Sequence, residues 1–335
     1  MRVLMSLCNV GRFNSQFSLA SVDVERAHAM DLVDCGHFLD VGRDTGITGL
    51  AVLSDGGIAA CIQGPDPRII FLDSDFRAQK LVRDARFADL HSILEQDGFL
   101  FVCCSGSNKV LKISLEDYAV SLFWEYPIDE PFLHINSLVF HRERPLVCSH
   151  KIAPEATGGG ASGGCWYLDD YEVLMAGLMQ PHTVTIDGDA VHCLSSHDFQ
   201  IATWLDGEVS FAPMQGYLRG MAIVDGRRVI GASSRRFVSR KKKQLEKYVD
   251  FAEVVANPLF MSSLAVADEA FALQRRVNTT ALGFEIYDLV ADPGVPDRLR
   301  ARPAAAVRMQ TMQRLVVSMR EQMQRREAAA GDRAQ

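Results

Sequence analysis

Residues 181–197 read PHTVTIDGDAVHCLSSH, and this stretch decides the fold. His182 and a small residue open an apolar run, an Asp-Gly turn follows, and a second apolar run ends at Ser196 and His197. Gly and Asp between two such runs are typical of a tight β-hairpin. The stretch therefore predicts two antiparallel strands, with polar residues where the first begins and the second ends.

The same pattern recurs at intervals of about 40 residues, which is the period of propeller blades. The polar residues that begin the first strands, which we call head residues, are Thr48, His91, Asn136, His182, Arg219 and Glu285. The polar residues that end the second strands, which we call tail residues, are Gln63, Ser105, His150, His197 and Arg235. From this repeat we predict an all-β fold, a six-bladed β-propeller.

The two ends of the repeat are complementary. Residues 2–9 have the pattern of a second strand that lacks a first, whereas residues 285–289 have the pattern of a first strand. Pairing them closes the ring and removes the exposed strand edges that an open sheet would leave. We therefore expect one propeller domain over residues 1–300, closed by its N-terminal strands.

Two segments depart from the repeat. Residues from about 240 to 272 are rich in good helix formers and predict a helical insertion in place of the outer strands of the fifth blade. Residues 301–335 form a separate tail, in which apolar residues recur near helical spacing. We expect a C-terminal helix that packs on the body or, in a homo-oligomer, on a second copy.

Composition limits the classes of function. Apolar residues make up 48% of the chain, charged residues 23%, and the formal net charge is −7, which offers no electrostatic reason to bind nucleic acid. The N-terminal apolar run is too short for a signal peptide, and no window predicts a membrane helix, so we expect a soluble, cytoplasmic protein without membrane partners. The eight cysteines include no CxxC pair and predict reduced, mostly buried thiols. Walker and Rossmann glycine patterns do not occur, so we expect no nucleotide cofactor.

A resemblance to a known family rests on four motifs. These are the Ser-Leu-Cys-Asn run from Ser6, the Pro181-His182 strand, the strand from Gly216 with its Ser-Ser-Arg tail, and the Glu-Ile-Tyr-Asp run from Glu285. On these motifs the chain resembles a bacterial family of conserved propeller proteins of unknown function. Its layout is distantly similar to the propellers of regucalcin, gluconolactonase and strictosidine synthase. The resemblance implies the fold and assigns no reaction, since similar layouts host lyases, hydrolases and isomerases.

Head and tail residues are expected to converge on one face of the propeller. Two imidazoles and a carboxylate, from His91, His182 and Glu285, predict a site for a divalent metal such as Zn, Mn, Fe or Ca, with Asn136 or His150 as a fourth ligand. A structural, hydrogen-bonded role for either histidine is the alternative. For the ring as a whole we favour a functional role, and a satisfied polar plug is the alternative.

The remaining positions predict the chemistry of a small polar or anionic substrate. We assign catalytic roles to Arg219 as an anion clamp and to His150 and His197 as general acid or base. An ion pair between Arg219 and Glu285 is the alternative for the arginine. The predicted substrate-binding residues are Thr48, Gln63, Ser105, Asn136 and Arg235. Two hypotheses follow: a lyase, hydrolase or isomerase, metal-dependent or not, or a non-catalytic propeller that binds a protein or small ligand.

Overall fold

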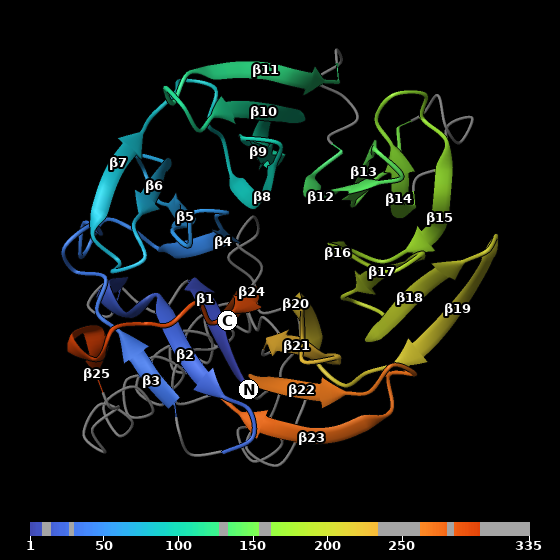
Figure 1. The fold of residues 1–335 in the computed structure, drawn as a ribbon. Helices are drawn as coiled ribbons and strands as arrows, with labels where there is room; N and C mark the ends of the chain where they lie inside the picture. The colour runs from blue at the N-terminus through green and yellow to red at the C-terminus, as the bar shows by residue number, and fades with distance from the viewer. Residues whose placement is uncertain are drawn as a thin grey trace, which may run out of the picture.

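A computed structural model describes residues 1–8, 15–26, 30–126, 133–153, 162–233, 262–279 and 285–301. Its strands form antiparallel units that surround one centre, each with one strand innermost and the others stacked outward (Figure 1). This arrangement is that of a β-propeller, and it confirms the predicted all-β class.

One unit is built from both ends of the chain. Its strands, from the centre outward, are β24 (Glu285–Ala291), β1 (Arg2–Cys8), β2 (Leu19–Asp23), β3 (Met30–Val33) and β25 (Arg300–Ala301). The pairing of β24 with β1 places Leu7 opposite Ile286 and confirms the predicted closure of the ring. In Figure 1 the blue and red strands of this unit lie together.

Five further units each contain four consecutive strands. The first two are β4 (Gly46–Val52), β5 (Ile58–Gln63), β6 (Arg68–Leu72) and β7 (Ala78–Val82), then β8 (Leu90–Gln96), β9 (Phe99–Cys104), β10 (Lys109–Ser114) and β11 (Val120–Glu125). The next two are β12 (Ile135–His141), β13 (Arg144–Ser149), β14 (Gly163–Tyr167) and β15 (Val173–Leu178), then β16 (Pro181–Asp187), β17 (Ala190–Ser195), β18 (Gln200–Leu205) and β19 (Glu208–Pro213). The last is β20 (Tyr217–Val224), β21 (Arg227–Ser233), β22 (Ser263–Ala267) and β23 (Leu273–Asn278). Short 3-10 turns lie at Ser15–Phe17, Ser105–Ser107 and Asp297–Leu299.

The helical insertion is wrong where the structure tests it. Strands β22 and β23 are ordinary outer strands of the fifth blade, and β22 pairs with β21 from Arg228 opposite Ala267 to Ala232 opposite Ser263. The segment misleads because β22 is buried on both faces and its Leu and Ala residues are also good helix formers. Residues 240–261 of that prediction, and the C-terminal helix, lie outside the described residues.

The hydrophobic core is divided among the gaps between blades. The buried apolar residues of the described chain form six clusters, and each cluster takes its members mainly from two neighbouring units. Trp166, for example, is fully buried between the units of β12 and β8. All eight cysteines are free and buried, as the sequence predicted. The described residues contain no helix that is long and apolar enough to cross a bilayer.

Each innermost strand bulges at its head residue. The strand register shifts around Thr48 in β4, His91 in β8, Asn136 in β12, His182 in β16 and Arg219 in β20. A bulge of this kind re-aims a side chain away from the ordinary alternation of the strand. It therefore turns one side chain per blade toward the centre.

Neighbouring blades are joined at these bulges by side chains that donate to main-chain carbonyls. The acceptor in each case is the carbonyl of the residue that precedes the bulge of the next blade. Leu90 accepts from Thr48 and Gln63, Ile135 from Ser105, Pro181 from Asn136, Leu218 from Ser196, and Ile286 from Ser233. We call these bonds the blade latches. The loss of a latch removes a hydrogen bond from a buried main-chain acceptor.

The blades approach so closely at the bulges that a side chain there would clash. A Cβ added to Gly49 would lie 2.2 Å from the His91 carbonyl oxygen of the next blade. We expect Gly49→Ala to lower the free energy of unfolding by about 2 kcal/mol or more, since main-chain atoms cannot move aside cheaply. Urea denaturation measures this, with Gly36→Ala as control, where the nearest atom is a flexible Asp34 side chain at 3.1 Å. Equal stability of the two variants would contradict the close packing.

Candidate functional site

The register of the sixth bulge corrects one head residue. In β24 the pairing with β1 shifts between Ile286 and Leu289, so the bulge holds Tyr287 and Asp288, not Glu285. Ile286 also accepts the blade latch from Ser233, as the residue before each head does. The structure therefore defines a central ring, which consists of Thr48, His91, Asn136, His182, Arg219 and Tyr287. Glu285 lies two residues earlier, half-buried at the rim.

Tyr287 brings distant members of the central ring together. Its ring lies 4.2 Å from the guanidinium carbon of Arg219 and 5.8 Å from the centroid of His91. Tyr217 flanks the other side of Arg219 at 5.1 Å. His91, His182 and Arg219 are each about 95% buried. Packing between two aromatic faces suits a guanidinium that must stay charged in a buried place.

Arg219 has unused hydrogen-bonding capacity. Burial acts to lower its pKa, but Tyr287, Tyr217 and the charge of Glu285 outweigh this and raise the pKa above its ordinary value. Its Nε and Nη1 donors find no hydrogen-bond partner among the described residues, and neither does Oδ1 of Asn136. Buried polar atoms without partners are rare and costly. Three such atoms lie in the central ring, on Arg219 and Asn136, and they argue against a fully satisfied polar plug.

The hydrogen bonds of His182 determine its tautomer. Nδ1 lies 2.9 Å from the Gln180 carbonyl oxygen and 2.8 Å from Ser196 Oγ. A carbonyl can only accept, and Ser196 gives its own hydrogen to Leu218, so Nδ1 carries the proton. Burial, then the charge of Arg219, then neighbouring histidines hold the pKa of His182 well below its ordinary value. The imidazole is therefore neutral, with the lone pair on Nε2.

A row of four imidazoles runs beside the ring. His91 lies 5.0 Å from His134, His134 stacks on His150 at 4.2 Å, and His150 lies 5.3 Å from His182, measured between ring centroids. The sequence repeat missed His134 because it lies two residues before a head residue. Asp89, His134 and Gln180 all precede head residues by two, and all have left-handed φ angles between 49° and 55°, a turn conformation that strand alternation does not predict.

Most of the predicted substrate-binding residues use their donor groups in hydrogen bonds that hold the fold together. The donor groups of Thr48, Ser105 and Asn136 form blade latches, and Gln63 donates both to Leu90 and to Asp89 Oδ1, at 2.6 Å. Their hydrogens thus go to neighbouring blades first. The Oδ1 atom of Asn136, in contrast, accepts no hydrogen bond from the described residues.

The register corrects the tail position in two blades. Ser195 pairs with Pro181, so Ser196 is the true tail of that blade, and His197 is exposed, with its ring stacked on Phe199. In the next blade Ser233 is the tail, and Arg235 lies outside the described residues. His150 does occupy the tail position of its blade, directly after the pair of Ser149 with Ile135.

The predicted metal ligands do not gather as a set. The ligand atoms of His91, His182 and Glu285 form no common group within the described structure, where the triad that does is Asp89, His91 and His134. The physical reason is the order of blades, since Asn136 separates the two predicted histidines, and the two-residue displacement of Glu285 from the ring.

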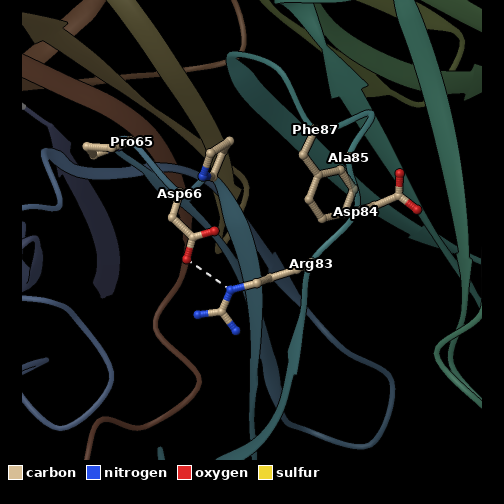
Figure 2. A pocket seen from close by; sticks show the side chains of 7 residues that line it. Pro65, Asp66, Arg83, Asp84, Ala85 and Phe87 are labelled. Carbon is tan, nitrogen blue, oxygen red and sulfur yellow. Dashed lines mark hydrogen bonds and ion pairs between the residues drawn. The ribbon is translucent and has the colours of Figure 1, made fainter.

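A surface depression lies on the same face, beside the central ring. Its volume is about 360 Å³, and its lining residues are Pro65, Asp66, Pro67, Arg83, Asp84, Ala85 and Phe87 (Figure 2). Asp66 accepts a hydrogen bond of 2.9 Å from Arg83, and Asp84 pairs with Arg86. Because its charges are already paired, this depression has no evident chemistry of its own.

Comparisons with known proteins support the fold and no more. No protein-family model matches the sequence, and no curated protein matches it. Among solved structures, a chain of a nidogen/laminin complex aligns with a TM-score of 0.59 and 10% identity, over 86% of this chain and 97% of that one. A protein of unknown function from Bacteroides caccae gives 0.57 and 9%, over 86% and 97%. A streptogramin B lyase gives 0.43 and 14%, over 71% and 84%.

Asp288, next to Tyr287 in the bulge, predicts a pH dependence of stability. Its carboxylate accepts from the main-chain N–H groups of Leu50 and Leu289, at 3.0 and 2.9 Å. Burial outweighs these bonds and raises its pKa to about 7. The folded chain therefore binds a proton that the unfolded chain has released, and stability present below about pH 4 is lost as the pH rises through about 7.

Urea denaturation between pH 4 and 8 measures this loss, which can reach about 1.4 kcal/mol per pH unit within the window. In Asp288→Asn the group cannot titrate, so we expect this part of the slope to vanish even if the variant is less stable throughout. An unchanged slope in Asp288→Asn would refute the assignment.

Proposed function

We propose that the protein is an enzyme that binds a small carboxylate or phosphate compound at the central ring and transfers a proton to or from it. The observation that carries the proposal is Arg219, a buried and permanently charged guanidinium with two donors unused among the described residues. A guanidinium fork matches the paired oxygens of carboxylate and phosphate. The acceptor Oδ1 of Asn136 supplies a complementary contact for a hydroxyl group on the same ligand.

The histidines beside Arg219 are suited to proton transfer. His182 presents a neutral imidazole whose Nδ1 proton is fixed by two oxygens, which leaves Nε2 as the proton acceptor. Removal of a proton next to a ligand carboxylate places the C–H electron pair on the ligand as an enolate, and the proton goes to Nε2. The charge of Arg219 stabilises that anion. His150, half-buried beside His182, links the site to solvent.

This chemistry is a step that lyases and isomerases share, and these are the classes that we favour over hydrolysis. It keeps His150 and Arg219 in the catalytic roles expected from the sequence and adds His182 in place of the exposed His197.

Anion binding is tested by isothermal titration calorimetry with two probes, inorganic phosphate and oxalate. We expect Arg219→Lys to weaken binding of at least one probe by about 10-fold, because an ammonium keeps the charge but loses the planar fork. The control is Arg228→Lys, a buried arginine of the same blade that pairs with Asp187 away from the ring. Equal affinities in the Arg219 variant and the wild type, or no binding of either probe, would overturn anion recognition.

Proton transfer is tested by hydrogen exchange into the ligand. Small carboxylates that bind are incubated with the enzyme in D2O, and loss of the C–H signal next to the carboxylate is followed by NMR. We expect exchange in the wild type and a rate at least 100-fold lower in His182→Gln, because general base catalysis contributes factors of about 100 or more. Binding without exchange would favour a non-catalytic receptor.

The second candidate is a propeller that binds another protein. It is favoured by the outer hairpin of one blade, where Leu205, Val209 and Phe211 on β18 and β19 are between 41% and 52% exposed. Apolar side chains on an outermost strand are an ordinary basis for protein contacts. The exchange experiment separates this candidate from the enzyme, because a binding surface at β19 leaves the central ring without turnover.

A further inference from the structure

A cluster of ligand-type side chains lies between two neighbouring blades, beside the central ring. It consists of Asp89, His91 and His134, which we call the Asp-His-His cluster. One carboxylate oxygen and one nitrogen of each imidazole lie within 4.8 Å of one another. Asp89 and His134 occupy equivalent positions, two residues before the head residues His91 and Asn136. The left-handed turns at these positions, with φ angles of 49° and 55°, bring the cluster together.

We infer that the Asp-His-His cluster is a binding site for a divalent transition-metal cation such as Zn²⁺. Two imidazoles and one carboxylate are a ligand set that zinc and related first-row cations prefer. Three protein ligands leave a coordination position for water or a substrate oxygen, as in catalytic rather than structural sites. The site faces the rim, because Asp89 is exposed and His134 is half-buried.

The ligand atoms of the cluster are spaced slightly more widely than they would be around a bound cation. Around a tetrahedral cation with bonds of about 2.1 Å, ligand atoms lie about 3.4 Å apart. One ligand atom of each of the three residues lies within 4.8 Å of those of the other two. The Asp89 side chain is 44% exposed, so it can turn by the required distance without disturbing the core.

Neighbouring residues orient the ligands from outside. Gln63 donates to Asp89 Oδ1 at 2.6 Å, which leaves the second carboxylate oxygen for a cation. His91 Nδ1 lies 3.0 Å from the Asp89 carbonyl oxygen, so its proton is on Nδ1 and the lone pair is on Nε2. Histidine ligands of metals commonly donate their other nitrogen to a carbonyl in this way. Left-handed residues other than glycine are also concentrated at functional sites.

The inference is independent of the proposed anion chemistry, since it uses neither the Arg219 donors nor His182. The two sites are nevertheless joined by the imidazole row, in which His150 stacks on His134 and adjoins His182. A metal-bound water at the cluster would thus lie at one end of the row and the anion site at the other.

The test is calorimetric titration of Zn²⁺ into protein that carries no histidine tag and has been dialysed against a chelator. We expect one equivalent to bind, and Asp89→Asn and His134→Asn each to weaken the affinity at least 10-fold. Asparagine is chosen because it tolerates the left-handed conformation that both positions require. The control is His37→Ala, an exposed histidine away from the cluster whose ring lies against Phe38 and whose Nε2 is 3.0 Å from the Phe76 carbonyl oxygen.

Titration with Co²⁺ gives a second readout, since nitrogen and oxygen ligands in a distorted tetrahedron produce visible absorption. Bands that form in the wild type and in His37→Ala, but not in the two asparagine variants, support the site. Failure of wild-type protein to bind Zn²⁺, or equal binding by both asparagine variants, overturns it. Circular dichroism of each variant establishes that a lost signal is not lost folding, and phosphate affinity is measured in parallel so that the two sites are judged separately.

Discussion

The structure depends on hydrogen bonds made where the innermost strands bulge. At five junctions a side chain of one blade donates to the carbonyl that precedes the bulge of the next blade, as Ser196 does to Leu218. Leaving such a buried acceptor unpaired would cost about 1 to 3 kcal/mol. The same bulge turns the head side chain to the centre. Closure of the ring and assembly of the site therefore have one structural origin.

The blade latches explain why the ring can hold such different side chains. The acceptors are main-chain atoms, and in most blades the donor is a tail residue such as Ser105, Ser196 or Ser233. In the blade whose tail is His150, the head residue Asn136 supplies the latch instead. Since either the head or the tail residue can donate the latch, the other residue need not take part in it. His91, His182 and Arg219 are heads of this kind, and they are the residues with chemistry.

The sequence predicted the repeat, five heads and the closure, because these follow from a local alternation of polar, small and apolar residues. It placed the sixth head at Glu285 instead of Tyr287, since Asp288 stands where other blades have a small residue and disguises the register. It shifted the tail to His197 because two serines precede that histidine and either fits the pattern. The one-residue slip at the tail changes which face the side chain occupies, and only pairing across strands resolves that slip or the two-residue slip at Glu285.

The sequence repeat could not predict the site residues that precede the heads, for a different reason. Asp89 and His134 precede their strands and reach the site through left-handed turns, which no strand alternation predicts. Their conformation costs free energy in residues with a Cβ, and glycine would adopt it more readily. Retaining a carboxylate and an imidazole where glycine is easier requires a compensating interaction. A cation held between Asp89, His91 and His134 would supply one, and it would couple the turns of two blades at the rim of the central ring.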